Sequence, residues 1–459
     1  MNPSQSLRSW LDWLRVAGRV KTVARAVDLV YELAAVVHRL DGDAAVLFKH
    51  PGGGSVPVVA GTCSRREDFA AALGTDVSGI LGRFTECQAH PRAPRLLPPG
   101  TAPAQEIRHT SGVDLLQLFP IPTHHEKDAG PCITAGVCIV RDVATGWHNL
   151  SIHRLQVIEP DRLTVLLLPR HTWHQFAAAE AAGRPLEIAI AVGLGPLLLL
   201  ASQATTAPGV SEYGIAAAML GDTPLDLVEG ISVDIQIPAQ AEIIIEGRLL
   251  PGVREPEGPF GEFRKYYGPR SLRPVVAVTA VTHRRDPIWQ TILPAGMEHL
   301  LLSAIPKEAH MLGVIRHTVP TVCAVHLTPG GACRYHAVVQ IHKGREGEAR
   351  AAALAAFAAH CDVKQVVVVD DDVDIFDSRE VEWAVATRVQ ADRDIFFVPG
   401  GARPPAHPSA AEGSGTKMGI DATAPIEGRV GRDGEPGAFE RTRIPGAASV
   451  RLEEYLDSE

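Results

Sequence analysis

Two glutamates flank a short stretch of glycine, proline and phenylalanine, Glu257-Gly258-Pro259-Phe260-Gly261-Glu262. Glycine and proline favour a tight, defined backbone and do not continue a helix, so this loop can direct both carboxylates into one pocket. Two carboxylates held close together titrate at different pH values, which leaves one proton available for donation. The stretch therefore predicts a proton-transfer site. The alternative is a surface turn whose two acids are only solvated.

A second polar pattern lies in 148–154, after a turn at 144–146. On a strand, alternate side chains point to opposite faces. One face would then carry Leu150, Ile152 and Arg154, and the other Asn149, Ser151 and His153. An arginine on a buried face needs an anionic partner. The two glutamates would serve, as would a carboxylate substrate held by two guanidinium nitrogens, and an ordinary surface arginine is the alternative.

Three residues from separate segments could hold a cation. Asn149 lies in the strand just described, His171 follows an apolar strand, and Glu212 precedes a helix predicted at 214–220. A mixed set of nitrogen and oxygen ligands suits Mn²⁺ or Mg²⁺ that holds a phosphate, rather than a structural zinc ion. Spacing alone does not distinguish this set from a chance combination among the 19 histidines.

Other segments carry weaker signals. Lys417 ends a Gly/Ser-rich run, which can cradle a phosphate, although the glycine spacing is not that of a Walker A loop. The acidic run 370–372 predicts a solvated loop at the end of a strand. His124-His125-Glu126 resembles a metal-ligand cluster, but adjacent residues of an extended chain point apart. The sequence contains no G-x-S-x-G nucleophile elbow and no convincing dinucleotide-binding fingerprint.

The elements that position these residues fall into three predicted parts. Residues 1–105 predict an α/β domain with helices at 7–14 and 28–40 and a strand at 45–48. Residues 106–304 predict a barrel-like or sandwich-like β domain, because short β-branched runs alternate with turn residues. Its strands are expected at 136–141, 164–168, 187–192, 231–237, 242–249 and 275–282.

Residues 305–459 again alternate strand and helix. Strands are expected at 322–327, 335–341 and 366–369, and helices at 347–360 and 379–388. The Gly-, Pro-, Ala- and Ser-rich composition from Pro399 to Gly415 predicts a long mobile loop.

Composition excludes several classes of protein. The chain has 459 residues and a net charge of −9 without a basic stripe, which gives no support for nucleic-acid binding. Its longest apolar run, 188–201, is shorter than the roughly 20 residues of a membrane span and contains glycine and proline. The seven cysteines are scattered without C-x-x-C spacing, so we expect reduced thiols and a cytoplasmic protein.

Five segments resemble, in chain order, the motifs of the UbiD family of reversible decarboxylases. The segment 149–154 resembles the N-x-x-I-x-R strand, 169–171 the P-x-H turn, and 210–212 the V-S-E loop. The segment 257–262 resembles the E-G-P-F/Y-G-E/D loop, and 417–423 the K-M-G-I-D-A-T signature. The resemblance runs from the first helix to about residue 425.

The resemblance implies a fold, a cofactor and a set of ligands. The fold is an α/β multidomain protein in which a split-β-barrel-like flavin-binding domain lies between two α/β domains. The cofactor is prenylated FMN, held through Mn²⁺ (or Mg²⁺) and K⁺. By position the metal ligands are Asn149, His171 and Glu212, and Lys417 contacts the phosphate. The remaining cofactor-binding positions are Ser151, Ile152, His153, Arg154 and Arg170.

The resemblance also implies the reaction, which is the reversible non-oxidative decarboxylation of an aromatic, heteroaromatic or α,β-unsaturated carboxylic acid. Glu262 would donate the proton, with Arg154 and Glu257 orienting it. A flavin prenyltransferase would supply the cofactor, and the C-terminal domain would form a homodimer or a higher homo-oligomer. The alternatives are a flavin carrier or assembly protein without turnover, and a metal-dependent hydrolase that uses the three metal ligands around an activated water.

The substrate is the open question. His299 and Lys307, eight residues apart, could bind a second carboxylate, as in family members of the furan-2,5-dicarboxylate type. The alternative is an ordinary helix-capping histidine and a surface lysine. Arg170 could bind a second anionic group or point to solvent.

Overall fold

The computed structural model describes residues 3–402, 414–427, 429, 435–446, 449–451 and 455. They form two compact units. The large unit comprises residues 3–313 and 327–336, and the small unit comprises 314–326, 337–402 and the described residues from 414 onward. The predicted α/β multidomain class is confirmed, whereas the three-domain division at residues 105 and 304 stays a prediction.

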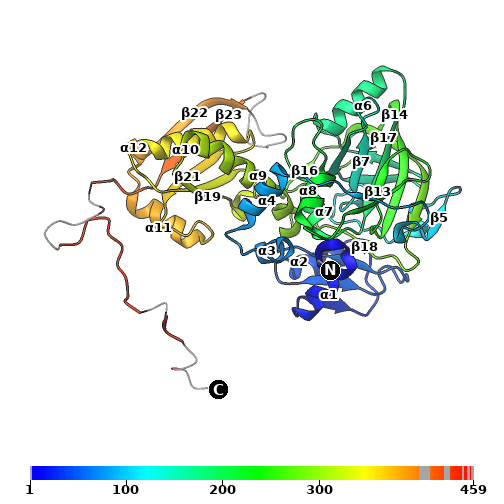
Figure 1. The fold of residues 1–459 in the computed structure, drawn as a ribbon, viewed down its shortest axis with the longest axis horizontal. Helices are drawn as coiled ribbons and strands as arrows, with labels where there is room; N and C mark the ends of the chain where they lie inside the picture. The colour runs from blue at the N-terminus through cyan, green and yellow to red at the C-terminus, as the bar shows by residue number, and fades with distance from the viewer. Residues whose placement is uncertain are drawn as a thin grey trace. The chain divides into compact units, whose positions relative to one another are not determined.

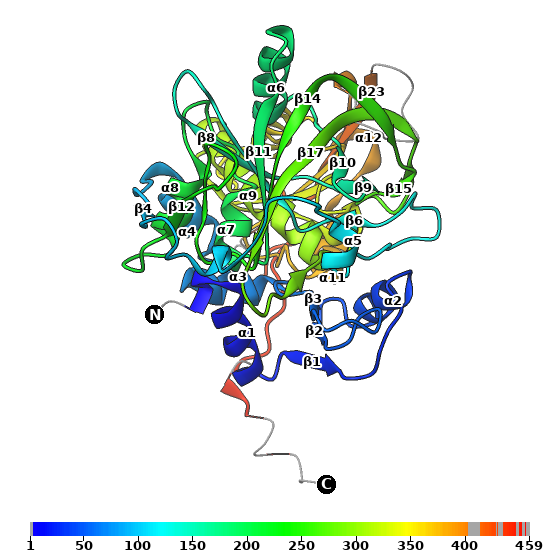
Figure 2. The ribbon, with the colours of Figure 1, turned by 90° about the vertical axis from the view of Figure 1, so that its right-hand side faces the viewer.

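A nine-stranded sheet forms the centre of the large unit, and it curls into a half-barrel (Figure 2). Its path, in order, is β6 (Cys132–Ile133), β9 (Leu155–Glu159), β10 (Arg162–Val165), β17 (Ser271–His283), β14 (Ile243–Glu257), β11 (Leu186–Val192), β7 (Val137–Arg141) and β8 (His148–Ile152). The ninth strand, β5 (Ile107–His109), pairs with β17. The two longest strands, β14 and β17, are antiparallel and pair from Ile243↔His283 to Glu257↔Ser271.

β-Branched residues fill the interior of this sheet, as the sequence predicts. Ile188, Ile190 and Val192 on β11 and Ile243 and Ile245 on β14 are fully buried in one continuous core. Gly136 lies where a Cβ atom would meet the side chain of Ile190, so the chain can approach β11 closely there.

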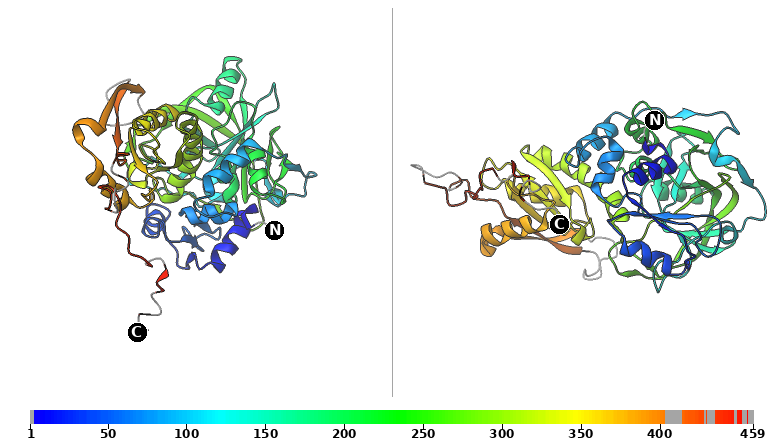
Figure 3. Two further views of the ribbon diagram at one scale, coloured as in Figure 1. Left: turned by 60° about the vertical axis from the view of Figure 1, so that its left-hand side comes forward. Right: turned by 90° about the horizontal axis from the view of Figure 1, so that it is seen from below.

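The N-terminal segment forms a second layer of the large unit (Figure 3). A four-stranded sheet contains β1 (Val20–Val23), β2 (Ala45–Phe48), β3 (Val58–Ala60) and β18 (Trp289–Gln290). Helix α1 (Leu7–Val16) begins with a capping box between Ser6 and Ser9 and buries Leu7, Trp10, Leu11 and Leu14. The other N-terminal helices are α2 (Glu32–Arg39), α3 (Arg66–Leu73) and α4 (Ile80–Ala89).

The remaining elements of the large unit carry or support the candidate site. The helices are α5 (Leu115–Leu118), α6 (His171–Ala181), α7 (Pro196–Ala201), α8 (Glu212–Met219) and most of α9 (Met297–Thr318). Short strands are β4 (Arg95–Leu96), β12 (Asp226–Glu229) and β13 (Gln236–Pro238) in one sheet, and β15 (Phe260–Gly261) with β16 (Tyr267–Gly268) in another.

The small unit is a five-stranded sheet with helices (Figure 1). The strand order is β19 (Val322–Leu327), β20 (His336–Ile341), β21 (Gln365–Asp370), β23 (Ser414–Asp421) and β22 (Ile395–Ala402). The helices are α10 (Glu348–Ala359), α11 (Ser378–Arg388) and α12 (Ala391–Asp394). Val367, Val369, Val373, Val381 and Ile420 belong to its core.

Several predicted elements differ from the structure. The helix expected at 28–40 begins only at Glu32, because Asp28 instead accepts a hydrogen bond from the Val30 N–H and Tyr31 has a positive φ of 71°. The strand expected at 231–237 is reduced to Gln236–Pro238, since the N–H groups of Ile231 and Ser232 bind the buried carboxylate of Glu246. The prediction of a mobile loop from Pro399 to Gly415 is wrong at both ends, because 399–402 belong to β22 and 414–415 to β23, whose backbones pair with each other. Its residues 403–413 lie outside the described ones.

None of the seven cysteines forms a disulfide, which agrees with the expected reduced thiols. Five thiols are buried in the large unit, and the two exposed ones, Cys323 and Cys361, belong to the small unit. Among the described residues, no helix is long and apolar enough to cross a bilayer.

Candidate active site

One arginine holds both glutamates of the Glu257–Glu262 loop. Arg154 lies between β8 and β9 and donates from Nε and Nη2 to Glu257 Oε1 and Oε2, at 2.6 and 2.9 Å. Its Nη1 donates to Glu262 Oε1. Its guanidinium carbon also lies 4.7 Å from the centre of the Phe260 ring, within the range of a cation–π contact. The arginine and both carboxylates therefore form one connected group.

The two carboxylates differ in their surroundings. The Glu257 side chain is 1% exposed and the Glu262 side chain 19% exposed, while Arg154 is 10% exposed. Burial disfavours the charged guanidinium, but the hydrogen bonds and charges of Glu257 and Glu262 outweigh it and raise the pKa of Arg154 above its ordinary value. Arg154 is thus a permanent cation.

The loop itself has an irregular backbone. Gly258 has a φ of 83°, which an L side chain rarely adopts, and the Gly258–Pro259 peptide bond is cis. The Gly258 N–H donates to Gln156 Oε1 at 2.9 Å. Glu262 follows β15, and its N–H donates to the Tyr266 carbonyl in the turn to β16. The backbone conformation of the loop therefore requires glycine at position 258.

The three predicted metal ligands converge in the large unit. His171 is the first residue of α6 and Glu212 the first residue of α8, while Asn149 lies on β8. His171 Nδ1 is 3.2 Å from Asn149 Oδ1, and Glu212 Oε2 accepts the N–H of Leu150 at 2.9 Å. Two helix N-termini therefore face one region, which is the arrangement that favours a phosphate.

A directed chain of hydrogen bonds orients the Asn149 amide. Asn149 Nδ2 donates to Thr172 Oγ1 at 2.9 Å, and the Thr172 and Ser151 hydroxyls are 3.1 Å apart. Ser151 Oγ lies 2.8 Å from His153 Nε2, and His153 Nδ1 lies 3.1 Å from the Leu166 carbonyl. Burial lowers the pKa of His153 to about 4, so the ring is neutral.

Because the Leu166 carbonyl can only accept, His153 Nδ1 carries the ring proton and His153 Nε2 accepts from the Ser151 hydroxyl. Ser151 Oγ must then accept from the Thr172 hydroxyl, and Thr172 Oγ1 accepts from the Asn149 amide nitrogen. The chain leaves Asn149 Oδ1 directed toward His171 as a possible ligand.

The donor set fits a divalent cation. Glu212 is 2% exposed and forms no ion pair with any side chain in the described ranges, and burial raises its pKa to about 7. A buried carboxylate of this kind is costly unless a cation neutralises it. Burial also lowers the pKa of His171, which favours the neutral imidazole that binds metals. Oxygen and imidazole ligands suit Mn²⁺ or Mg²⁺.

Nearby polar atoms fit the phosphate end of a cofactor. The Trp147 ring centre lies 5.1 Å from that of His171, and Gln175 lies one helical turn after His171. Trp147 Nε1 and both amide atoms of Gln175 are buried and have no hydrogen-bond partner among the residues that the structure describes. Buried polar atoms normally have partners, so these atoms fit a bound polar group.

A cationic cluster lies next to the loop. Lys307 Nζ and Arg334 Nη2 both donate to the neutral Ser303 hydroxyl, at 2.6 and 2.9 Å. Burial, Arg334 and Lys307 lower the pKa of His299 to about 4. Phe263, the residue after Glu262, lies 4.1 Å from the Arg334 guanidinium carbon and packs edge-on to His299, with their ring centres 6.5 Å apart.

The alternative for His299 and Lys307, an ordinary helix-capping histidine and a surface lysine, is partly wrong. Lys307 is only 7% exposed, so it is not a surface lysine. His299 does accept the Ala295 N–H at 3.2 Å, as a capping histidine would.

Two other predicted residues lie apart from these contacts. Arg170 is exposed at the N-cap of α6. Lys417 lies within β23 of the small unit, which corrects the expected loop, because its backbone pairs with Val398. Its ammonium donates to the carbonyls of Cys361 and Val363 at 2.9 and 2.6 Å, and its contact with a phosphate stays a prediction.

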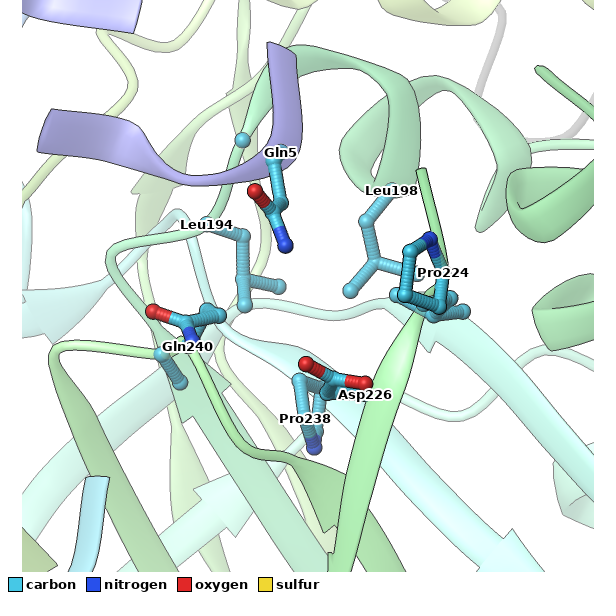
Figure 4. Close-up of a pocket in the computed structure, with 10 residues that line it drawn as sticks. Gln5, Leu194, Leu198, Pro224, Asp226, Pro238 and Gln240 are labelled. Carbon is cyan, nitrogen blue, oxygen red and sulfur yellow. The ribbon is translucent and has the colours of Figure 1, made fainter. Parts of the chain in front are cut away.

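The structure contains two further features without an assigned role. His360, Cys361 and Asp362 of the small unit have ligand atoms within 4.8 Å of one another, but the Lys417 ammonium already occupies the carbonyls of that turn. A small pocket, open to solvent, is lined by Gln5, Leu194, Leu198, Asp226 and Gln240 (Figure 4). Arg95 binds both oxygens of Asp226, and no predicted site residue lines this pocket.

Sequence reasoning missed some residues of the site. Thr172 binds Asn149, Gln156 binds Gly258 of the glutamate loop, and Arg334 shares the Ser303 hydroxyl with Lys307, but none of the three belongs to a motif. Arg334 lies 27 residues beyond Lys307, so only the packing of 327–336 onto the large unit brings them together.

Three consecutive stretches of the chain match the domains of one protein family. Residues 11–87 match the N-terminal domain of 3-octaprenyl-4-hydroxybenzoate carboxy-lyase (UbiD), residues 95–297 its Rift-related domain, and residues 300–422 its C-terminal domain. Together they span most of the chain.

Relatives and solved structures agree with this match. The anhydromevalonate phosphate decarboxylase of Methanothermobacter thermautotrophicus is 39% identical over 421 residues, which cover 92% of this chain and 97% of that protein. The UbiD-class enzyme HmfF from Pelotomaculum thermopropionicum, solved with FMN, is 53% identical with a TM-score of 0.95, covering 98% of this chain and 100% of that one. Its evolved dimeric form, solved with prFMN (prenylated FMN), is 51% identical with a TM-score of 0.90 and the same coverage.

The family, the curled central sheet and the joined Arg154, Glu257 and Glu262 all point to the same chemistry. This chain belongs to the UbiD family of prenylated-FMN-dependent enzymes, and it is a decarboxylase of that class.

Proposed function

We propose that this decarboxylase acts on a conjugated acid with a second anionic group, of the furan-2,5-dicarboxylate type. The supporting observation is the cationic cluster of Lys307, Arg334 and His299 beside Phe263, the neighbour of Glu262. Both cations donate to the same hydroxyl, so an anion bound beside it would be attracted by both charges. One carboxylate would then lie at Arg154 and the other at the cluster.

The roles of the loop residues follow from their contacts. Arg154 would orient the reacting carboxyl group and both glutamates, and Glu262 would donate the proton that replaces CO₂. Bound prenylated FMN supplies the electron-accepting carbon framework that stabilises the charge left by CO₂. Asn149, His171 and Glu212 would hold Mn²⁺ or Mg²⁺ at its phosphate, with K⁺ as a second cation and Lys417 as a further phosphate contact.

A phosphorylated unsaturated acid is the second candidate substrate. The same cluster could bind a phosphate, and the 39%-identical relative is named for anhydromevalonate phosphate. A substrate panel distinguishes the two, using protein produced together with a flavin prenyltransferase and supplied with Mn²⁺ and K⁺. The panel contains furan-2,5-dicarboxylate, 2-furoate, an α,β-unsaturated monoacid, gallate and anhydromevalonate phosphate, and the readouts are CO₂ release and the absorbance and mass of the flavin.

The Lys307→Met variant sharpens this test. We expect kcat/KM for the dicarboxylate to fall about 100-fold, whereas that for 2-furoate changes less than about 3-fold. Lys49→Met, which removes an exposed lysine far along the chain, is the matched control. Equal losses on both acids would contradict the proposed second-anion site.

Each outcome of the panel has a defined meaning. Turnover of anhydromevalonate phosphate alone would favour the second candidate. Bound flavin without turnover of any acid would favour a carrier, and activity without bound flavin would favour the metal-dependent hydrolase.

We also propose that the chain forms a homodimer or a higher homo-oligomer through the small unit. Phe397, 65% exposed on β22 at the edge of the five-stranded sheet, supports this interface. Sedimentation should show an oligomer that Phe397→Ser weakens and Val143→Ser, at an exposed position of the large unit, leaves intact. A monomeric wild-type chain at micromolar concentration would contradict this proposal.

A further inference from the structure

Residues 125–129 of the large unit, called the brace below, contact the Glu257–Glu262 loop. Asp128 Oδ1 accepts the Gly261 N–H at 2.8 Å, and the Ala129 N–H donates to the Pro259 carbonyl at 3.0 Å. The ring of His125 lies against Gly261, since a Cβ atom built on this glycine would collide with it. Three residues of the brace therefore contact the loop: His125 and Asp128 contact Gly261, and Ala129 contacts Pro259.

Asp128 is itself held firmly in place. Its side chain is fully buried, and its second oxygen, Oδ2, accepts the His125 N–H at 2.9 Å. Burial disfavours the carboxylate, but the hydrogen bonds from His125 and Gly261 outweigh it and keep the pKa of Asp128 below its ordinary value. Both oxygens thus have fixed donors, and the side chain cannot rotate without losing one of them.

The loop has few other backbone bonds of its own. β15 and β16 pair only through Phe260↔Gly268 and Gly261↔Tyr267. The Gly258 N–H is bound by a side chain, Gln156, in the same way that the Gly261 N–H is bound by Asp128. The two glycines of the loop are therefore fixed by side chains outside it, while Arg154 fixes the carboxylates within.

Asp128 acts on the backbone just before the proton donor. The Gly261 N–H belongs to the Phe260–Gly261 peptide group, which the Gly261 Cα joins to the Gly261–Glu262 peptide group, so fixing the first group limits where the Glu262 side chain begins. A displacement of about 1 Å in a catalytic group costs roughly 100-fold in rate. An unbound Gly261 would let Glu262 move relative to Arg154.

We propose that Asp128 is a positioning residue for Glu262, with the His125 ring as the wall that keeps Gly261 in place. This inference rests on the proposed role of Glu262 as the proton donor. Asp128 does not touch the substrate or the flavin in this arrangement, and its effect passes through the backbone of Gly261.

The Asp128→Ala variant tests the role of the carboxylate. We expect kcat to fall at least 10-fold, KM to change less than about 2-fold, and the flavin content to stay at the wild-type level. Hydrogen exchange of the peptide that covers 258–266 should become faster. Asp128→Asn keeps an acceptor for the Gly261 N–H, so it should recover part of the lost rate.

Asp114→Asn is the matched control, because Asp114 Oδ1 also accepts backbone N–H groups, those of Leu116 and Gln117, but at the start of α5. It should change neither kcat nor exchange in 258–266. Unchanged kcat and exchange in Asp128→Ala would overturn the proposal. If instead the wild-type protein has no turnover, the proposed function fails, and the exchange measurement still tests the brace.

Two further substitutions test the contact between the His125 ring and Gly261. They also test the proposal if the Asp128 variants do not fold. Gly261→Ala should lower kcat, because its methyl group collides with the His125 ring. His125→Ala in the same chain should restore the rate to that of His125→Ala alone. A double variant as slow as Gly261→Ala would contradict the role of His125.

Discussion

At the scale of single residues, the contacts of Arg154 distinguish the two glutamates. Glu257 receives two N–H groups and is almost completely buried, whereas Glu262 receives one and is partly exposed. Glu262 therefore has an oxygen that is not committed to Arg154. The geometry favours Glu262 as the acid and Glu257 as the anchor of the arginine.

Replacing the acid should separate catalysis from cofactor binding. Glu262→Gln keeps the shape and a hydrogen bond with Arg154 but removes the transferable proton, so we expect decarboxylation to fall by roughly 10²–10⁴-fold. Flavin content, read from absorbance, should not change. Glu255→Gln, on β14 and near Arg162, is the control. Retention of most of the turnover in Glu262→Gln would remove Glu262 from its assigned role.

The hydrogen-bond chain from Asn149 to Leu166 predicts an effect on metal binding. Thr172→Val removes the hydroxyl that accepts the Asn149 amide, so the amide can rotate. We expect the affinity for Mn²⁺ to fall about 10–100-fold, as for other outer-shell partners of metal ligands. Isothermal titration calorimetry of the metal-free protein measures this affinity. Thr85→Val is the control, because the Thr85 hydroxyl donates to the Leu81 carbonyl within its own helix.

Sequence patterns predicted that residues of the local motifs lie together, and they missed contacts that depend on packing. Asp370 illustrates the limit, because the acidic run predicts a solvated loop. In the structure Asp370 is buried and bound by Arg388 at 2.9 Å and by Arg429. Its partners lie 18 and 59 residues away in the chain, a distance over which no local pattern carries information.

At the scale of elements, the start of α9 is anchored by one buried side chain. Glu298 accepts hydrogen bonds from the N–H groups of Gly61 and Cys63 and from the Thr62 hydroxyl, at 2.9, 3.0 and 2.5 Å. These donors follow β3, so Glu298 ties the N-terminal sheet to the helix that carries His299 and Lys307.

Removing this anchor should destabilise the large unit. Glu298→Ala leaves three buried donors without their acceptor, which we expect to cost about 2–4 kcal/mol and to lower the thermal midpoint by several degrees. Differential scanning calorimetry measures the shift. Glu86→Ala, at an exposed position of α4, should change the midpoint by less than about 1 °C.

Regular elements were predicted well where burial and periodicity agree. The sequence predicts β2, β11, β19 and α10 to within a residue or two, because the strands are short apolar runs and the helix is rich in alanine. It fails at 231–237, where an apolar run meets the carboxylate of Glu246, which comes from another strand. The competing hydrogen bonds are invisible to any local pattern.

At the scale of the whole molecule, buried neutral histidines make stability depend on pH. Burial lowers the pKa of His124 to about 4, and it lowers those of His153 and His299 to a similar value. An unfolded histidine titrates near 6.5. Below that pH the unfolded state binds more protons than the folded state, so stability is full above pH 6.5 and falls as the pH drops toward 4.

One variant isolates this effect. At pH 5 each such histidine should cost about 2 kcal/mol. His124→Gln keeps a hydrogen-bonding group for Thr291 but cannot titrate, so the thermal midpoint should fall less between pH 7.5 and pH 5 than in the wild type. His50→Gln, at an exposed position, should leave the wild-type pH dependence intact. Identical pH dependence in His124→Gln and the wild type would contradict the assignment.

The distribution of the thiols has a practical use. All five buried cysteines belong to the large unit, and burial raises the pKa values of Cys63, Cys132, Cys138 and Cys333, which keeps them unreactive. Cys323 and Cys361 are exposed and belong to the small unit. A maleimide dye should therefore label the native protein in one unit only. Labelled in this way, the small unit carries a fluorescent reporter without an engineered cysteine.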